Sequence, residues 1–257
     1  MVSTPIASSS PESYAQRLRG HRFAAVRSAL GKVVHWHHRI FDRRRLEAVA
    51  IERIEDQPLL VLPGVLNPKL MRTGAFFASV VRRDLRVWGA EVLDLGTGSG
   101  VCAVVAARRA RKVVAVDLNP AAVRCALINA LVAGLEDKIE VLQGDLFAPV
   151  KDRRFDLVLF NPPFLRGVPR DLADLAWRST DVAERFAAGL DAHLAPEGSA
   201  LLLLSTFGDA AAFLAALVAA GFAITLDAER EFLNERLFLF AVRRPFDAVV
   251  CARETVP

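Results

Sequence analysis

Cysteine is scarce in this sequence. The three cysteines are far apart and show no metal-ligand spacing, which argues against a disulfide framework and a zinc site. A group of histidines lies near the N-terminus, but adjacent helical positions point in different directions, and no carboxylate or cysteine lies at ligand spacing. We therefore interpret the thiols as small buried groups and expect no metal site at any of these residues, which are Cys102, Cys125, Cys251, His35, His37 and His38.

Long hydrophobic runs are also missing. The longest apolar stretches, residues 200–205 and 210–220, are too short to span a bilayer, so we expect no membrane association. The first residues lack the basic and then apolar pattern of a secretory signal, and we expect a cytoplasmic protein. Residues 1–13 are rich in Ser, Pro and Thr, and we expect them to be disordered.

Positive charge is concentrated near the N-terminus. Residues 17–53 contain ten Lys or Arg and three acids, a net charge of +7, whereas the whole chain carries +4. Apolar residues recur at three- and four-residue spacing up to about Ile54, which predicts two or three helices. We therefore describe residues 14–62 as a basic helical segment. It could bind nucleic acid or an acidic partner, or it could be a solvated arginine-rich surface.

From residue 90 onward, apolar strands alternate with helices. Repeated βα units with fully apolar strands indicate an α/β fold with a parallel sheet that helices cover on both faces. We expect strands at 91–95, 112–116, 139–142, 155–160, 199–204, 222–226 and 237–242, and helices at 73–82, 101–109, 120–133, 171–193 and 209–220.

A glycine-rich turn follows the first of these strands. Such a turn lets a ligand approach the backbone and leaves the N–H groups of the next helix pointing at the ligand. A dinucleotide site would need a glycine where the chain has Val101. The acid before the turn would repel a pyrophosphate, but it suits the cationic amino-acid end of S-adenosylmethionine. We expect cofactor contacts from Asp94, Gly96, Thr97, Gly98 and Gly100.

Acids also follow the second and third strands. Asp117 can accept hydrogen bonds from both hydroxyls of a ribose. Leu118 and Asn119 would then flank an adenine, although Asn119 is also suited to cap the next helix. After the third strand, the Asp145 carboxylate can accept a hydrogen bond from the adenine amino group while Leu146 packs on the ring.

The fourth strand ends in Asn161-Pro162-Pro163-Phe164, beside the first strand, where open α/β sheets bind ligands. The two prolines stiffen this loop and have no N–H group. The Asn161 side chain and the Pro162 carbonyl can together accept both N–H bonds of one NH₂ group, while Phe164 offers a flat face for stacking. The lone pair of a planar nitrogen is delocalised, so catalysis depends on its positioning. We expect these four residues to be the catalytic loop, and we expect Asn161 to contact the cofactor as well.

In order and spacing, these elements resemble the seven-stranded class I S-adenosylmethionine-dependent methyltransferases, in particular their Asn-Pro-Pro-aromatic group. The similarity is greatest to the release-factor glutamine methyltransferase family and runs over about residues 61–242. The resemblance implies a doubly wound sheet of strand order 3-2-1-4-5-7-6, a methyltransferase domain at residues 63–257, and S-adenosylmethionine as cofactor. It also implies that Asn161 holds the side-chain amide of a protein glutamine.

Several features depart from that family's pattern, among them residues 178–181 after Trp177, where the family typically has a Gly-rich stretch, and the basic N-terminal extension. Phe164 stands where the family usually has Tyr. Related RNA guanine methyltransferases also have Phe at this position. Arg72 replaces an acid near the cofactor, although the following Thr73 remains as an expected cofactor contact. The methyl acceptor is therefore a protein glutamine as first choice, with an RNA base or a small molecule of secondary metabolism as alternatives.

Overall fold

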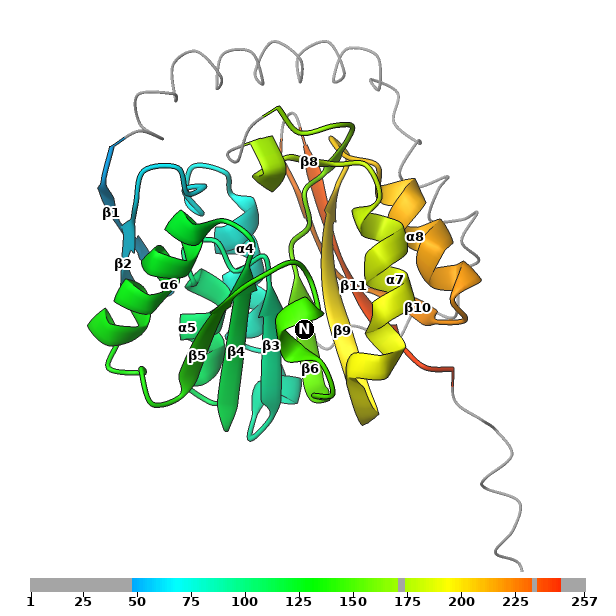
Figure 1. Cartoon of the computed structure of the whole chain (residues 1–257), viewed down its shortest axis with the longest axis horizontal. Helices are drawn as coiled ribbons and strands as arrows, with labels where there is room; N and C mark the ends of the chain where they lie inside the picture. Colours follow the sequence, from blue (N-terminus) through cyan, green and yellow to red (C-terminus); the bar gives the residue numbers. More distant parts are fainter. Residues whose placement is uncertain (1–47, 171–173, 233–234, 246–257) are drawn as a thin grey trace, which may run out of the picture.

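The computed structural model describes residues 48–170, 174–232 and 235–245 (Figure 1). The expected disordered N-terminus, most of the basic segment, the histidine cluster and Cys251 lie outside these residues. No helix in the described ranges is long and apolar enough to cross a membrane.

A seven-stranded sheet forms the centre of the protein. In chain order its strands are β3 (Glu91–Leu95), β4 (Lys112–Asp117), β5 (Ile139–Gln143), β6 (Phe155–Phe160), β9 (Leu194–Ser205), β10 (Ala223–Glu231) and β11 (Arg236–Arg243). Their spatial order is β10-β11-β9-β6-β3-β4-β5, which confirms the expected order 3-2-1-4-5-7-6. Six strands run in the same direction, and β11 runs antiparallel to both of its neighbours, which the sequence pattern did not indicate.

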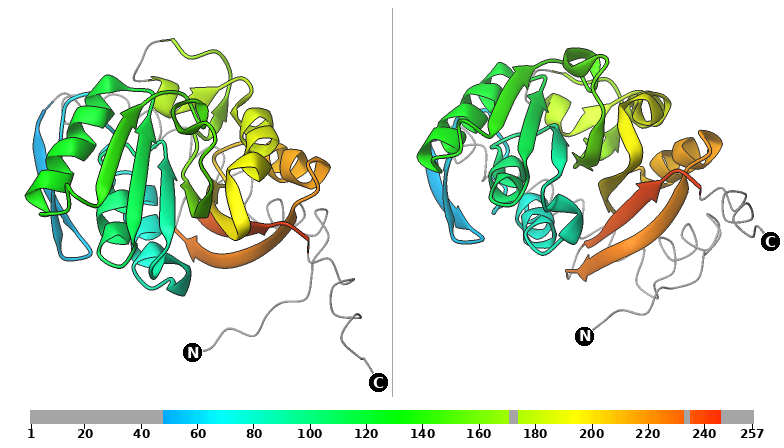
Figure 2. Two further views of the ribbon diagram at one scale, coloured as in Figure 1. Left: turned by 60° about the horizontal axis from the view of Figure 1, so that its bottom comes forward. Right: turned by 90° about the horizontal axis from the view of Figure 1, so that it is seen from below.

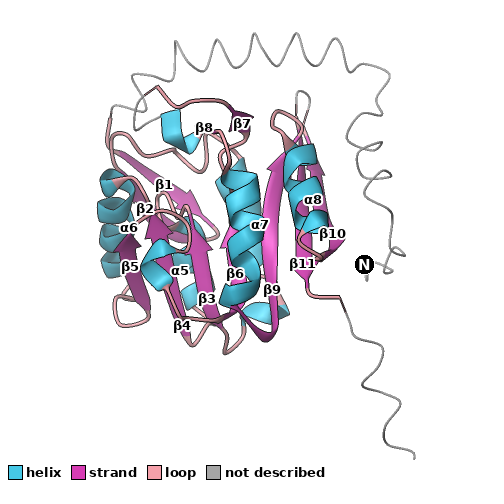
Figure 3. Cartoon of the chain, turned by 45° about the vertical axis from the view of Figure 1, so that its right-hand side comes forward, coloured by secondary structure: helices cyan, strands magenta, loops and turns pink. Residues whose placement is uncertain are grey.

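Helices cover both faces of this sheet, as expected (Figures 2 and 3). Side chains alternate along each strand, so Leu157 and Leu159 of β6 face one core while Val158 and Phe160 face the other. The helices over the first core are α4 (Thr73–Val81) and α5 (Val101–Ala107), with α6 (Pro120–Val132) beside them. The helices over the second core are α7 (Val182–His193) and α8 (Ala210–Ala219). Short 3₁₀ turns occur at η1 (Leu85–Val87) and η2 (Ala148–Val150).

The end of the basic segment is a β-hairpin, so the predicted helix up to Ile54 is wrong there. Strands β1 (Ala50–Ile54) and β2 (Gln57–Val61) pair antiparallel through a two-residue turn with positive φ angles of 47° and 64°. This turn geometry matches the twist of paired strands. The Asn129 side chain of α6 accepts from the Leu60 amide and donates to the Leu60 carbonyl, both at 2.7 Å. Strand pairing and the hydrogen bonds to Asn129 stabilise the hairpin, although the apolar spacing of the sequence favours a helix.

The expected helix 171–193 is correct only from Val182 onward. Before it, the described chain forms a 3₁₀ turn, η3 (Asp174–Ala176), and a short strand, β8 (Arg178–Ser179). Strand β8 pairs in parallel with β7 (Leu165–Arg166), which directly follows the Asn-Pro-Pro-Phe loop. Pairing with the segment that follows the catalytic loop therefore replaces the expected helix at β8.

Candidate active site

The parallel strands β3, β4, β5 and β6 all end at one edge of the sheet, and the predicted site residues that follow these strands lie there. The glycine loop after β3 has three left-handed glycines, Gly96, Gly98 and Gly100, with φ of 62°, 57° and 79°. Gly96 is exposed and leaves its backbone open to a ligand. A Cβ on Gly100 would lie 3.0 Å from Cα of Ala126, so this glycine lets α5 approach α6 closely.

Asp94 supports the glycine loop from beneath. It is only 4% exposed, and its Oδ2 accepts hydrogen bonds from the Thr97 hydroxyl at 2.6 Å and the Ala103 amide at 3.1 Å. Burial raises the pKa of Asp94 to about 7, and the two hydrogen bonds only partly offset that rise. A cation bound nearby would favour the charged form, and the contact of Asp94 with the amino-acid end of the cofactor stays a prediction.

This raised pKa predicts how stability changes with pH. Between about pH 4, the pKa of an unfolded Asp, and about pH 7, the native Asp94 stays protonated while the unfolded form ionises. Asp94 therefore stabilises the fold at low pH, and its contribution is lost as the pH rises to 7. Relative to Asp94→Asn, we expect the unliganded wild type to lose roughly 2 kcal/mol between pH 5 and 7, with the difference levelling off above about pH 8. Urea unfolding of both proteins at each pH measures this difference, and a flat difference from pH 5 to 7 would contradict the assignment.

Asp117 joins the loops of β4 and β3. Its Oδ2 accepts from the Gly98 amide at 2.8 Å and its Oδ1 from the Asn119 amide at 2.9 Å. Burial raises its pKa. The Leu118 amide is a third backbone donor to this carboxylate, which still has acceptor capacity for a ribose hydroxyl. The neighbouring Leu118 is 41% exposed, and Asn119 caps α6 by accepting from the Ala121 amide at 2.9 Å.

The loop after β5 is held beside Asp117, since the Gly144 amide donates to the Asp117 carbonyl at 3.0 Å. In this loop Asp145 forms an ion pair with Arg185 of α7, a partner that the sequence did not predict. Leu146 has a left-handed φ of 46°. These positions bring the two predicted adenine contacts to the same edge as the glycine loop, and their roles stay predictions.

Thr73 is the first residue of α4 and is 7% exposed. Its amide donates to the Met71 carbonyl, and no hydrogen bond in the described structure joins it to the loops of β3, β4 or β5. Its role as a cofactor contact therefore stays a prediction.

The catalytic loop contains a buried acceptor with no partner. Oδ1 of Asn161 is inaccessible to solvent and has no hydrogen-bond partner among the described residues. The loop lies against the glycine loop, because a Cβ on Gly96 would come within 4.0 Å of the Asn161 carbonyl oxygen. An unsatisfied buried acceptor costs about 1–3 kcal/mol, so this oxygen is suited to receive a donor from a bound molecule.

Phe164 is fixed at the far end of the loop. Its carbonyl accepts from the Asp209 amide at 2.9 Å, and a Cβ on Gly208 would lie 2.5 Å from that carbonyl oxygen. Beside Phe164 is a small pocket that is open to solvent. Its walls combine apolar side chains with Arg166 and three acids, and its lining includes Pro163, Phe164, Arg166, Asp181, Val182, Glu184, Asp209, Ala212 and Phe213.

Asn129 is a supporting residue that sequence reasoning missed. It is fully buried on α6, and its Nδ2 donates to the Ser99 carbonyl of the glycine loop at 2.8 Å, in addition to its bonds to Leu60. The available signal was a lone amide on the otherwise apolar inner face of this helix. Within the described ranges, no three His, Cys, Asp or Glu residues gather as a metal site.

The strand order, together with a glycine loop and an Asn-Pro-Pro-Phe loop at one edge, defines a class I methyltransferase fold. Residues 60–225 match the family model "Methyltransferase small domain", and the chain belongs to this family.

Curated relatives include enzymes with different acceptors. A ribosomal protein uL3 glutamine methyltransferase from Bradyrhizobium diazoefficiens is 36% identical over 42% of this chain and 38% of its own length. A release factor glutamine methyltransferase from Cereibacter sphaeroides is 38% identical over 44% of this chain and 46% of its own length. A tRNA1(Val) (adenine(37)-N6)-methyltransferase from Actinobacillus pleuropneumoniae is 36% identical over 35% of this chain and 42% of its own length. The chain thus matches less than half the length of each of these relatives.

Solved structures support the fold. The 16S rRNA N2 G1207 methyltransferase of T. thermophilus, in complex with AdoMet and guanosine, superposes with a TM-score of 0.57 and 24% identity over 77% of this chain and 50% of that one. The E. cuniculi Mtq2–Trm112 complex, which methylates the termination factor eRF1, gives a TM-score of 0.53 and 20% identity. The match covers 71% of this chain and 99% of that one.

Proposed function

We propose that this protein is an S-adenosylmethionine-dependent N-methyltransferase that acts on a planar nitrogen, with the side-chain amide of a protein glutamine as its acceptor. The observation that carries the proposal is the buried Asn161 Oδ1, which has no partner in the described structure and lies beside the glycine loop. We expect the activity in the cytoplasm.

The residues at the sheet edge fit the cofactor. The open backbone at Gly96 suits the amino-acid end of the cofactor. The remaining acceptor capacity of Asp117 suits the ribose, and the exposed Leu118 suits the adenine. When bound, S-adenosylmethionine supplies an electrophilic methyl group on a sulfonium. The residues expected to hold it are Asp94, Gly96, Thr97, Gly98, Gly100, Asp117, Leu118, Asn119, Asp145, Leu146 and Thr73.

The catalytic loop can prepare the acceptor nitrogen. Asn161 Oδ1 and the Pro162 carbonyl would accept the two N–H bonds of one amide and draw its lone pair out of conjugation. The nitrogen then forms the new N–CH₃ bond as the C–S bond breaks, and the electron pair of that bond stays on sulfur. The excess proton leaves the nitrogen for water afterwards, so no strong base is needed, and positioning supplies most of the rate.

Charge beside the loop supports a protein acceptor over RNA. The pocket next to Phe164 has three acids on its walls, Asp181, Glu184 and Asp209, against one Arg166. Asp181 also pairs with Arg185 at 3.1 Å, so only a small negative excess remains at this position, and it disfavours a phosphate backbone weakly. The RNA alternative rests on Phe164 itself, on nucleic-acid contact through the basic segment 14–62, and on the tRNA methyltransferase relatives.

A labelling experiment tests the acceptor. We expect tritium from methyl-labelled S-adenosylmethionine to enter a release-factor domain carrying a Gly-Gly-Gln loop, but not the same domain with Glu in place of that Gln. Total RNA and a small-molecule extract serve as parallel acceptors. Label in RNA only would contradict the glutamine proposal, and RNA binding that weakens steeply with salt would then support the alternative.

A further inference from the structure

Two of the four residues in the catalytic loop cannot donate a backbone hydrogen bond, because Pro162 and Pro163 have no N–H group. The position of Asn161 therefore depends on how the loop is held at its ends. On one side it continues from β6. On the other side, the Leu165 amide donates to the Trp177 carbonyl at 2.8 Å and the Gly167 amide to the Ser179 carbonyl at 3.0 Å.

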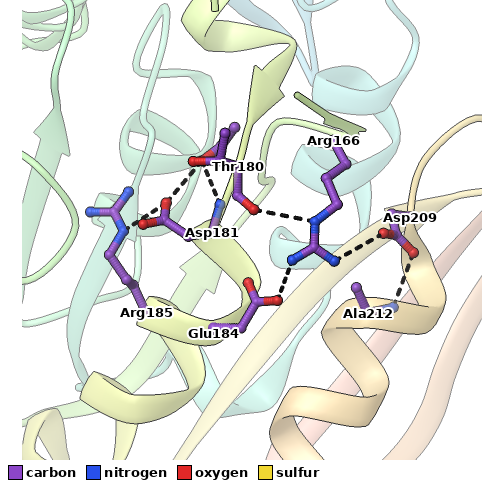
Figure 4. Close-up of polar contacts among 8 residues, drawn as sticks. Arg166, Thr180, Asp181, Glu184, Arg185, Asp209 and Ala212 are labelled. Atoms are coloured by element: carbon purple, nitrogen blue, oxygen red, sulfur yellow. Dashed lines mark hydrogen bonds and ion pairs between the residues drawn. The ribbon is translucent and has the colours of Figure 1, made fainter. Parts of the chain in front are cut away.

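Between these two backbone bonds, the side chain of Arg166 joins three segments (Figure 4). Its Nη2 donates to Oε1 of Glu184 in the first turn of α7 at 2.5 Å, and its Nε to the Thr180 carbonyl at 3.2 Å. Its Nη1 lies 3.7 Å from Oδ2 of Asp209, the N-cap of α8. One guanidinium thus connects the end of the catalytic loop to the starts of both helices on this face.

Asp209 strengthens this connection, because its backbone amide also donates to the Phe164 carbonyl at 2.9 Å. The same residue therefore holds the loop through its backbone and faces Arg166 through its side chain. Only the planar fork of an arginine can reach Glu184, Thr180 and Asp209 at once, since a lysine ammonium is a single point charge.

We propose that Arg166 is a positioning residue for methyl transfer, which holds the catalytic loop so that Asn161 Oδ1 meets the acceptor nitrogen. This inference rests on the proposed function. Arg166, Glu184 and Asp209 are all substantially exposed, with side-chain exposures of 53%, 50% and 39%, so their ion pairs add little to global stability. These ion pairs instead fix the position of the catalytic loop, and small displacements of that loop reduce the rate of methyl transfer strongly.

The test compares Arg166→Ala with Arg166→Lys and with a control, Arg111→Ala. Arg111 forms a comparable exposed ion pair with Glu91 at 3.1 Å, at the opposite edge of the sheet. We expect Arg166→Ala to lower kcat by about 10- to 100-fold, with the cofactor Kd and the Tm near wild type. Lysine should restore only part of kcat, and the control should match the wild type.

Hydrogen exchange supplies a readout that needs no acceptor. The amides of Leu165 and Gly167 should exchange faster in Arg166→Ala than in the wild type or in Arg111→Ala. A kcat within twofold of the wild type, or unchanged exchange at these two amides, would overturn the inference. If the wild type methylates no acceptor, the proposed function fails, and the exchange comparison still decides whether Arg166 holds the loop.

Discussion

Replacing Asn161 by alanine is expected to lower kcat by about 10²–10³-fold, the scale seen when one preorganised polar group is removed from an active site. The variant loses Oδ1, the buried acceptor that has no partner in the described structure. Without this oxygen, one N–H bond of the acceptor is unpaired and the nitrogen keeps its planar, weakly nucleophilic form. Cofactor affinity should change less than about twofold, because the tight glycine loop and the Asp117 bonds do not involve this side chain.

Single-turnover kinetics and calorimetric titration separate these two effects. Asn161→Asp is the matched control, since it keeps an acceptor oxygen in the same place and should fall between the wild type and the alanine variant. An alanine variant with unchanged kcat would show that Asn161 does not hold the acceptor. A large loss of cofactor affinity would show instead that Asn161 acts mainly on the cofactor side.

The central part of the fold follows from local patterns. Most of β6, residues 157–160, is buried on both faces of the sheet, and that burial appears directly as an unbroken apolar run. The N-terminal hairpin could not be predicted in this way. Residues 50–61 are only partly buried, and their strand form depends on pairing with each other and on the Asn129 side chain, which lies far away in the sequence.

The same distinction applies to the site. The convergence of the glycine loop, Asp117 and Asn161 could be predicted, because the carboxyl ends of parallel strands meet at one edge. The ion pair between Asp145 and Arg185 could not be predicted, and neither could the ion pair between Arg166, at the end of the catalytic loop, and Glu184. Both pairs depend on where α7 begins, and that start is set by the β7–β8 pairing rather than by helix propensity.

Replacing Asp117 by alanine should raise the Kd for S-adenosylmethionine by about 10- to 100-fold, the equivalent of losing one or two hydrogen bonds to a charged group. The change removes the expected ribose acceptor and also leaves the amides of Gly98 and Asn119 without their partner. Titration of the cofactor measures this loss. Asp156→Ala is the matched control, because Asp156 likewise accepts from a backbone amide, that of Glu91 at 2.8 Å, at the opposite edge of the sheet.

A cofactor analogue separates ribose recognition from loop support. S-adenosylhomocysteine and its 2′-deoxy form should bind the wild type with different affinities, because the deoxy form has one hydroxyl fewer to donate to Asp117. In Asp117→Ala this difference should disappear. If the variant still prefers the ribose form by the wild-type factor, Asp117 does not recognise the ribose, and its effect on affinity comes from holding Gly98 and Asn119 in place. The comparison thus assigns the carboxylate either to the ligand or to the loop.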